Sequence, residues 1–155
     1  MENQIQKVMT KKIKSIPQGT PWLVANEMMI ESRIRHLPVV DEAGDVIGIV
    51  SQKDLLVAEG LEDFTVDFFM SSPVVNLRED SSLQKAIFKM LELKISAVLV
   101  VDDKDEVVGI VTTDDLLWFL AKKLDEEEKK ESGFKSFFSL QTVGEVSRML
   151  SEIGI

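Results

Sequence analysis

The chain has 155 residues, of which 45% are hydrophobic and 29% charged, and its formal net charge is −9. This composition supports a folded core and excludes wholesale disorder, and the acidity argues against a large basic face for duplex DNA. Cysteine is absent and His36 is the single histidine, which excludes disulfides, thiolate chemistry and multi-histidine metal sites within one chain. No apolar run approaches the roughly 20 residues that span a bilayer, and the N-terminus lacks the apolar stretch of a signal peptide, so we expect a cytoplasmic protein.

The chain repeats itself at a constant offset of 61 residues. Three pairs of matching segments define this register: Leu37–Asp41 and Val98–Asp102, Val46–Ser51 and Val107–Thr112, Asp54–Leu56 and Asp115–Leu117. A register shared over about 50 residues without a gap indicates an internal duplication. We place the first copy at residues 1–61 and the second at residues 62–124.

Each copy predicts the same order of elements. A short segment (8–16 or 69–77) precedes an amphipathic helix (21–32 or 82–93), with Thr20 as the expected N-cap of the first helix. Two apolar strands follow, separated by the polar turns 41–45 and 102–106, and their nearly continuous Val and Ile predict burial on both faces. A further helix is expected to begin near Asp54 or Asp115. A copy of about 60 residues buries little core alone, so we expect the two copies to pack together.

The pattern changes after Leu120. Residues 122–131 are charged and favour a helix that extends into solvent, and Ser132-Gly133 is expected to end it. Beyond it we predict a short amphipathic helix that docks on its own core or, alternatively, contacts a subunit or partner. Residues 125–155 therefore form a charged helix end and a C-terminal amphipathic extension.

The best candidate for chemistry is the strand-to-helix junction, which occurs twice. Ser51 closes one buried strand and Asp54 follows three residues later, and Thr112 and Asp115 repeat this spacing. One interpretation is helix capping, in which the hydroxyl and the carboxylate bond backbone N–H groups. The other is ribose recognition, because an ionised carboxylate offers two acceptor oxygens to the two hydroxyl donors of a ribose diol. The two roles are compatible.

These residues resemble a tandem cystathionine β-synthase (CBS) domain pair, also called a Bateman module. The likeness rests on Leu-Pro-Val-Val-Asp and Gly-Ile-Val-Ser/Thr-x-x-Asp-Leu-Leu and covers about Val8 to Leu120. It implies an α/β (α+β) fold of two β-α-β-β-α repeats packed with pseudo-twofold symmetry, to which this chain adds a short C-terminal helical extension. It also implies two related clefts that bind adenine nucleotides such as AMP, ADP or ATP, or S-adenosylmethionine, and a disc-like homodimer.

The resemblance also implies roles for individual residues. Ribose contacts are expected from Asp54 and Ser51 in the first copy and from Asp115 and Thr112 in the second. Base contacts, mainly through the backbone, are expected from these residues: Ser15, Ile16, Asn76 and Leu77. Phosphate contacts are expected from a further set: Arg33, Arg35, His36, Lys94 and Ser96. No catalytic residue and no metal ligand is expected, although Mg²⁺ would be able to accompany a nucleotide.

The two copies differ in charge. Residues 1–60 hold 7 Lys/Arg against 8 Asp/Glu, whereas residues 61–118 hold 5 Lys/Arg against 12 Asp/Glu. Ser96 and Ala97 stand where the first copy has Arg35 and His36. We therefore expect one stronger nucleotide site, centred on Asp54, and one weaker or empty site.

Several functions remain to be weighed. The favoured one is a free-standing nucleotide sensor that signals by conformational change to an unidentified protein effector or subunit. The alternative is a dimerisation or protein-interaction module without a regulatory ligand. An enzyme is rejected because no catalytic motif occurs, and a divalent-cation sensor or RNA binder is a minor alternative.

Overall fold

The structure is a computed structural model that describes residues 4–58, 60–61 and 63–130. One compact unit ends at Leu116 and holds the strands of both copies, and a second unit begins at Leu117. Among the described residues, no helix has the length and apolarity needed to cross a membrane.

Two three-stranded sheets carry the fold, one from each copy of the repeat. The first contains β1 (Ile16–Pro17), β2 (His36–Val40) and β3 (Val46–Ser51) in that order. The second contains β4 (Asn76–Arg78), β5 (Ala97–Val101) and β6 (Val107–Thr112). In both sheets the first pair is parallel and the second antiparallel. The predicted duplication is therefore present in the topology as well as in the sequence.

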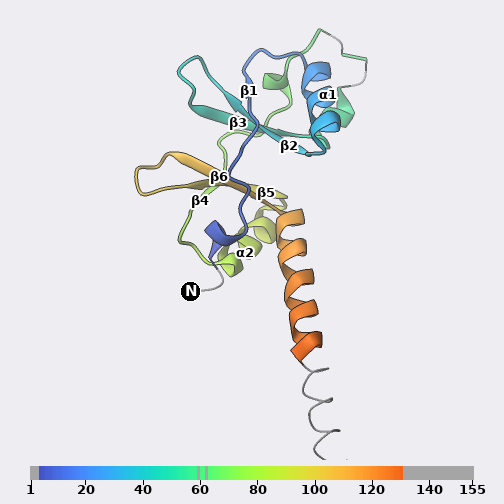
Figure 1. The fold of residues 1–155 in the computed structure, drawn as a ribbon. Helices are drawn as coiled ribbons and strands as arrows, with labels where there is room; N and C mark the ends of the chain where they lie inside the picture. The colour runs from blue at the N-terminus through green and yellow to red at the C-terminus, as the bar shows by residue number, and fades with distance from the viewer. Residues whose placement is uncertain (1–3, 59, 62, 131–155) are drawn as a thin grey trace, which may run out of the picture. The chain divides into compact units, whose positions relative to one another are not determined.

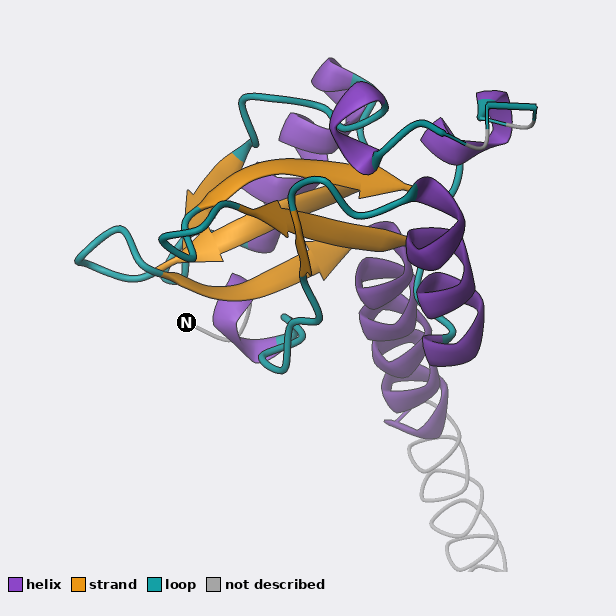
Figure 2. Cartoon of the chain, turned by 90° about the horizontal axis from the view of Figure 1, so that it is seen from above, coloured by secondary structure: helices purple, strands orange, loops and turns teal. Residues whose placement is uncertain are grey.

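The two sheets lie one above the other, with α1 (Trp22–Ser32) packed on β2 and α2 (Leu83–Leu93) packed on β5 (Figure 1). Seen from above, the strands of the two sheets overlap (Figure 2). Val46 and Ile49 of the first sheet pack against a buried cluster of the second that includes Leu99 and Ile110. The strands thus bury apolar side chains on both faces, as their composition predicts.

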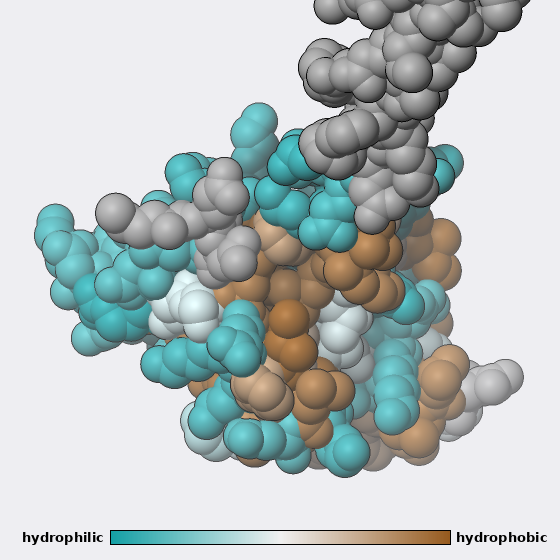
Figure 3. All heavy atoms as spheres, turned by 90° about the horizontal axis from the view of Figure 1, so that it is seen from below, coloured by the Kyte–Doolittle hydropathy of each residue, from teal (hydrophilic) through white to brown (hydrophobic). Residues whose placement is uncertain are grey.

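A core of buried apolar residues lies beneath α1. Ala25 and Met29 of the helix are buried against Leu37 and Val39 of β2. Figure 3 shows the molecule from the side on which α2 lies, where apolar and polar residues are mixed on the surface. By its exposed fractions, α2 leaves part of its apolar side chains uncovered, Ile87 among them.

Two sequence predictions about helix starts need correction. Thr20 does not cap α1, because its hydroxyl donates instead to the Pro17 carbonyl (2.6 Å) and Pro21 occupies the N-cap position. Only four residues, Asp54–Val57, form a helix after β3, and it is a 3-10 helix. The second copy behaves as predicted, with a continuous helix over residues 113–130.

The two repeats exchange the segments that precede their first strands. The 3-10 helix η1 (Ile5–Lys7) lies against the second repeat, where the Ile5 N–H donates to the Ser81 carbonyl (2.9 Å). The matching helix η3 (Val66–Phe68) lies against the first, and buried Val66 belongs to the core under α1. Isolated bridges from Thr10 to Ile110 and from Ser71 to Ile49 continue the exchange. Each repeat is thus completed by a piece of chain from outside itself.

The second unit contains the later part of the 113–130 helix. Two ion pairs at helical spacing line it, Lys123 with Glu126 (3.2 Å) and Lys129 with Asp125 (2.7 Å). The helix includes residues 122–130 of the stretch that the sequence predicts to be a charged helix. The helix end predicted at Ser132-Gly133 and the C-terminal amphipathic helix lie outside the described residues.

Candidate functional site

The hydroxyl–carboxylate junction has the same geometry in both repeats. Ser51 donates from its backbone N–H (2.8 Å) and from its hydroxyl (2.6 Å) to Asp54 Oδ2, and the Asp54 N–H donates back to Ser51 Oγ (3.2 Å). Thr112 and Asp115 make the same three bonds at 2.7, 2.8 and 3.4 Å. The Asp54 and Asp115 N–H groups thus bond the hydroxyl three residues earlier, as the capping interpretation predicts, although the N-cap position of the 3-10 helix Asp54–Val57 is Lys53, which makes no side-chain cap bond. In both junctions the other oxygen, Oδ1, accepts no hydrogen bond within the described part of the chain.

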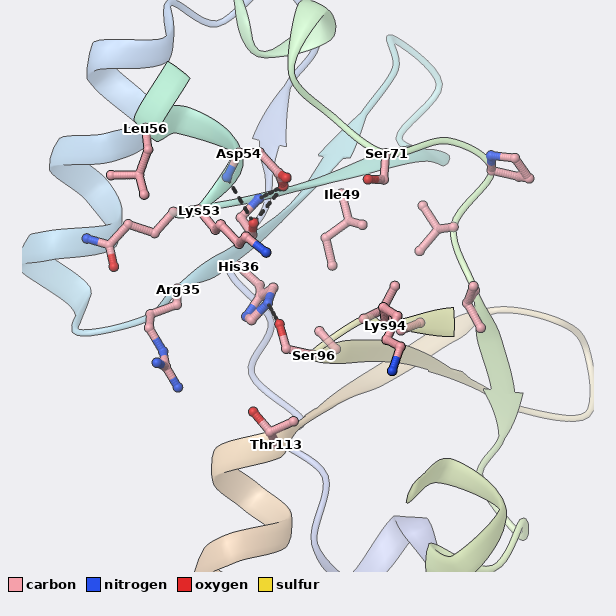
Figure 4. Close-up of a pocket in the computed structure, with 17 residues that line it drawn as sticks. Arg35, His36, Ile49, Lys53, Asp54, Leu56, Ser71, Lys94, Ser96 and Thr113 are labelled. Carbon is pink, nitrogen blue, oxygen red and sulfur yellow. Dashed lines mark hydrogen bonds between the residues drawn. The ribbon is translucent and has the colours of Figure 1, made fainter. Parts of the chain in front are cut away.

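A cavity of about 550 Å³ opens in front of the first junction, between the two repeats. Asp54, Lys53 and Ser51 line it from the first repeat, and Lys94 and Ser96 line it from the second (Figure 4). Its size lies within the range of small-molecule sites. The cavity therefore brings an acceptor carboxylate together with cationic and hydroxyl groups, on a scale that suits a nucleoside derivative.

The wall of the cavity is largely apolar. Ile49 comes from β3, Val74 and Val75 come from the segment before β4, and Ile95 precedes β5. Flat heterocyclic rings bind well to such apolar surfaces. The polar groups of the cavity lie toward its Asp54 side and its Ser96 side (Figure 4). The arrangement fits a ligand with one apolar ring and one polar end.

His36 joins the two repeats across this cavity. Its Nε2 shares a hydrogen bond with Ser96 Oγ (2.8 Å), and the two side chains point toward one another in Figure 4. Burial lowers the pKa of His36 below its ordinary value, and the Arg35 guanidinium lowers it further. Asp54 and Asp114 oppose these effects without reversing them. The imidazole is therefore held toward its neutral form.

The cavity gathers some of the residues predicted from sequence and leaves others outside. Six of them line it: Ser51, Asp54, Arg35, His36, Lys94 and Ser96. The rest do not: Arg33, Ser15, Ile16, Asn76, Leu77, Thr112 and Asp115. Ile16 and Leu77 are buried, whereas Ser15, Asn76 and Arg33 are exposed. Arg33 ends α1 in the left-handed conformation, with φ of 53°.

Sequence reasoning missed several residues of this cavity. Lys53 was not singled out although it adjoins Asp54, and Ser71, Val74 and Val75 come from the other copy. Adjacency to Asp54 was a usable signal for Lys53. For the others the only signal is the exchange of segments between repeats, which periodicity within one copy does not reveal.

Comparison with known proteins identifies the family. The CBS domain model matches twice, at residues 5–60 and 63–122. Together with two stacked β-α-β-β units and a cleft between them, this shows that the chain belongs to the CBS domain family, as a tandem pair. The predicted family and fold class are confirmed.

Curated relatives are longer proteins. The chain is 38% identical over 92 residues to L-aspartate semialdehyde sulfurtransferase of Methanocaldococcus jannaschii, covering 59% of this chain and 18% of that enzyme. It is 34% identical over 109 residues to homoserine O-acetyltransferase of Methanococcoides burtonii, covering 70% of this chain and 22% of that enzyme. The chain thus spans about a fifth of the length of these enzymes, and the likeness concerns their CBS part.

Among solved structures, the CBS domain pair of protein MJ0100 superimposes with a TM-score of 0.72 and 31% identity, over 77% of this chain and 97% of that one. That structure is a complex with 5′-methylthioadenosine and S-adenosylmethionine. A CBS pair of this fold therefore binds adenosine derivatives.

Proposed function

We propose that this CBS pair is a regulatory module that binds an adenosine-containing ligand in the cavity at Asp54. The observation that carries the proposal is the state of the Asp54 carboxylate. Ser51 fixes its Oδ2, while Oδ1 has no donor among the described residues, and Asp54 lines a cavity of about 550 Å³. A ribose diol supplies the missing donors, and a bond to an ionised oxygen is stronger than a neutral one.

The other parts of the ligand are assigned by the chemistry of the wall. The apolar surface at Ile49 and Val74 takes the base, and the adjoining segment Asn76–Leu77 stays the proposed backbone contact for it. Ser15–Ile16 has the same proposed role in the cleft at Asp115 and Thr112. A charged tail meets Arg35 and Lys94, with His36 and Ser96 between them.

AMP, ADP, ATP and S-adenosylmethionine are the candidate ligands, with Mg²⁺ accompanying a polyphosphate. The adenosine part rests on the likeness to MJ0100, which binds methylthioadenosine and S-adenosylmethionine. The charge asymmetry of the copies supports the Asp54 cleft as the stronger site. Arg33, outside the cavity lining, is the least supported of the proposed phosphate contacts.

Signalling follows if the ligand binds one arrangement of the two repeats better than another. The cavity has walls from both repeats, so a bound ligand favours the arrangement in which Asp54 and Lys94 both reach it. The response is then read by a protein effector or by a second subunit of a homodimer. We place this sensor in the cytoplasm, where adenosine nucleotides are abundant.

Isothermal titration calorimetry of wild type, Asp54→Asn and Asp115→Asn with AMP, ATP, methylthioadenosine and S-adenosylmethionine tests the proposal. Asp54→Asn is expected to weaken binding about tenfold to a hundredfold, because a charged hydrogen bond to ribose is lost. Asp115→Asn is the matched comparison, since it removes the same charge from the same hydroxyl–carboxylate arrangement outside this cavity, and it is expected to affect the weaker cleft only. Wild type that binds none of these ligands, or equal binding by wild type and Asp54→Asn, contradicts the proposal.

A second candidate function is a dimerisation module without a regulatory ligand. It is favoured by the apolar side chains that α2 exposes, at Ile87 (40%), Phe88 (53%) and Leu91 (62%). Exposed apolar surface of this kind is typical of protein interfaces. An oligomeric state that is the same with and without every adenosine ligand favours this candidate over the sensor.

A further inference from the structure

An ion pair crosses between the repeats at the edge of the cavity. Arg35 Nη2 lies 2.5 Å from Asp114 Oδ1, and both side chains are 56% exposed. Arg35 precedes β2 of the first repeat and lines the cavity, whereas Asp114 stands in the first turn of the 113–130 helix and is outside the lining. In Figure 4 Arg35 extends toward Thr113, the neighbour of Asp114.

The pair is possible in only one of the two clefts. The 61-residue offset places Lys53 opposite Asp114 and Ser96 opposite Arg35. Lys53 and Ser96 cannot form an ion pair, so the internal symmetry is broken at this point. Asp114 is therefore a charge reversal specific to the second copy, and the structure sets it against a cation of the Asp54 cavity.

We propose that Asp114 is an internal competitor for Arg35 and thereby sets the selectivity of the Asp54 cavity for the charge of the ligand. The inference rests on the proposed function of that cavity. An anionic ligand tail takes Arg35 from Asp114, whereas a neutral tail leaves the pair in place. Because exposed ion pairs contribute little to stability, an anion within reach of Arg35 and Lys94 displaces Asp114 readily.

The exchange also gives anionic ligands a distinct structural effect. Arg35 then bonds the ligand, and Asp114 at the start of the last helix is left without its partner from the first repeat. A neutral adenosine derivative fills the same cavity with the pair intact. The two classes of ligand thus produce different contacts between the repeats, which is what distinct readouts from one site require.

The test compares Asp114→Asn with wild type in titrations with AMP and with methylthioadenosine, which has no phosphate. Asp114→Asn is expected to bind AMP about two- to fivefold more tightly, which corresponds to losing one exposed competing ion pair. Its affinity for methylthioadenosine is expected to stay unchanged. Asp103→Asn is the matched control, because it removes one negative charge from an exposed turn of the same repeat.

The other outcomes are also decisive. Weaker AMP binding by Asp114→Asn overturns the proposal, since Asp114 would then position Arg35 for the ligand. An equal change in the affinities for AMP and for methylthioadenosine also overturns it. Arg35→Gln combined with Asp114→Asn is expected to bind AMP no better than Arg35→Gln alone. If wild type binds no adenosine derivative, the proposed function fails, and pyrophosphate is used as the probe instead. Tighter pyrophosphate binding by Asp114→Asn than by wild type then supports the competition for Arg35, and unchanged binding overturns it.

Discussion

At the scale of single residues, the two oxygens of Asp54 are in different environments. Oδ2 is held by the N–H and hydroxyl of Ser51, as in a capping arrangement, whereas Oδ1 accepts no hydrogen bond within the described part of the chain, and the residue lines the cavity. The cap fixes the position of the carboxylate before any ligand arrives. A preorganised acceptor of this kind loses little conformational freedom on binding.

The pH dependence of stability is predicted from His36. Its pKa is lowered from 6.5 in the folded protein by burial and by Arg35. As the pH falls through 6.5, the unfolded chain takes up a proton that the folded protein does not, so the free energy of unfolding falls. Above this range both forms are neutral and His36 contributes no pH dependence.

Denaturant unfolding of wild type and His36→Gln between about pH 7.5 and pH 5.5 measures this contribution. The free energy of unfolding of wild type is expected to fall relative to that of His36→Gln as the pH falls. The contributions of the carboxylates are common to both proteins and cancel in the difference. A difference that stays constant over this range contradicts the assignment.

At the scale of elements, two glycines permit the exchanged segments to cross the sheets. A Cβ at Gly48 of β3 would overlap the Met70 sulfur and lie 2.9 Å from its Cγ, and one at Gly109 of β6 would lie 2.5 Å from the Met9 sulfur. The two contacts are related by the 61-residue offset. Each holds the segment before one repeat against the sheet of the other.

Gly48→Ala is expected to destabilise the protein by about 1–3 kcal/mol, because the added methyl group overpacks against Met70. Thermal or denaturant unfolding measures the loss. In the double variant with Met70→Ala the space is restored, so the two effects are expected to be less than additive. Gly44→Ala is a useful contrast, since an added Cβ meets nothing there and the penalty comes from φ of 89° alone. Strict additivity of the Gly48 and Met70 changes would contradict the packing argument.

The amphipathic helices and the Val- and Ile-rich strands were predictable from periodicity, and the duplication fixed their order. The role of Thr20 was not predictable, because the nearby Pro17 carbonyl accepts the hydrogen bond of its hydroxyl. Nor was the shortness of the helix at Asp54, which is a 3-10 helix of four residues. Six of the predicted site residues share one cavity, since the antiparallel pairing of His36 with Ser51 sets the start of β2 beside the junction after β3, and the segment before β5 lies across from both. Val74 and Val75 were missed because they reach that edge through contacts between copies.

At the scale of the whole molecule, the exchange of η1 and η3 predicts that neither copy folds alone. Fragments cut at the proposed boundary, residues 1–61 and 62–155, each lack a segment that the other carries: Val66 is fully buried in the core of the first repeat, and Ile5 is fully buried beside the second. Circular dichroism is expected to show each fragment largely unfolded. Co-expressed fragments are expected to purify together as a folded complex. A stably folded 1–61 fragment would contradict this prediction.

The exchanged segments also determine the order of events while the chain is being made. The first repeat has its helix and strands once β3 has left the ribosome, but its core stays open until Val66 emerges. The second repeat is completed by η1, which precedes it in the chain and has therefore been synthesised before it. Folding of the first half therefore has to wait for the second half to begin, and the cleft between them is completed only when both are present.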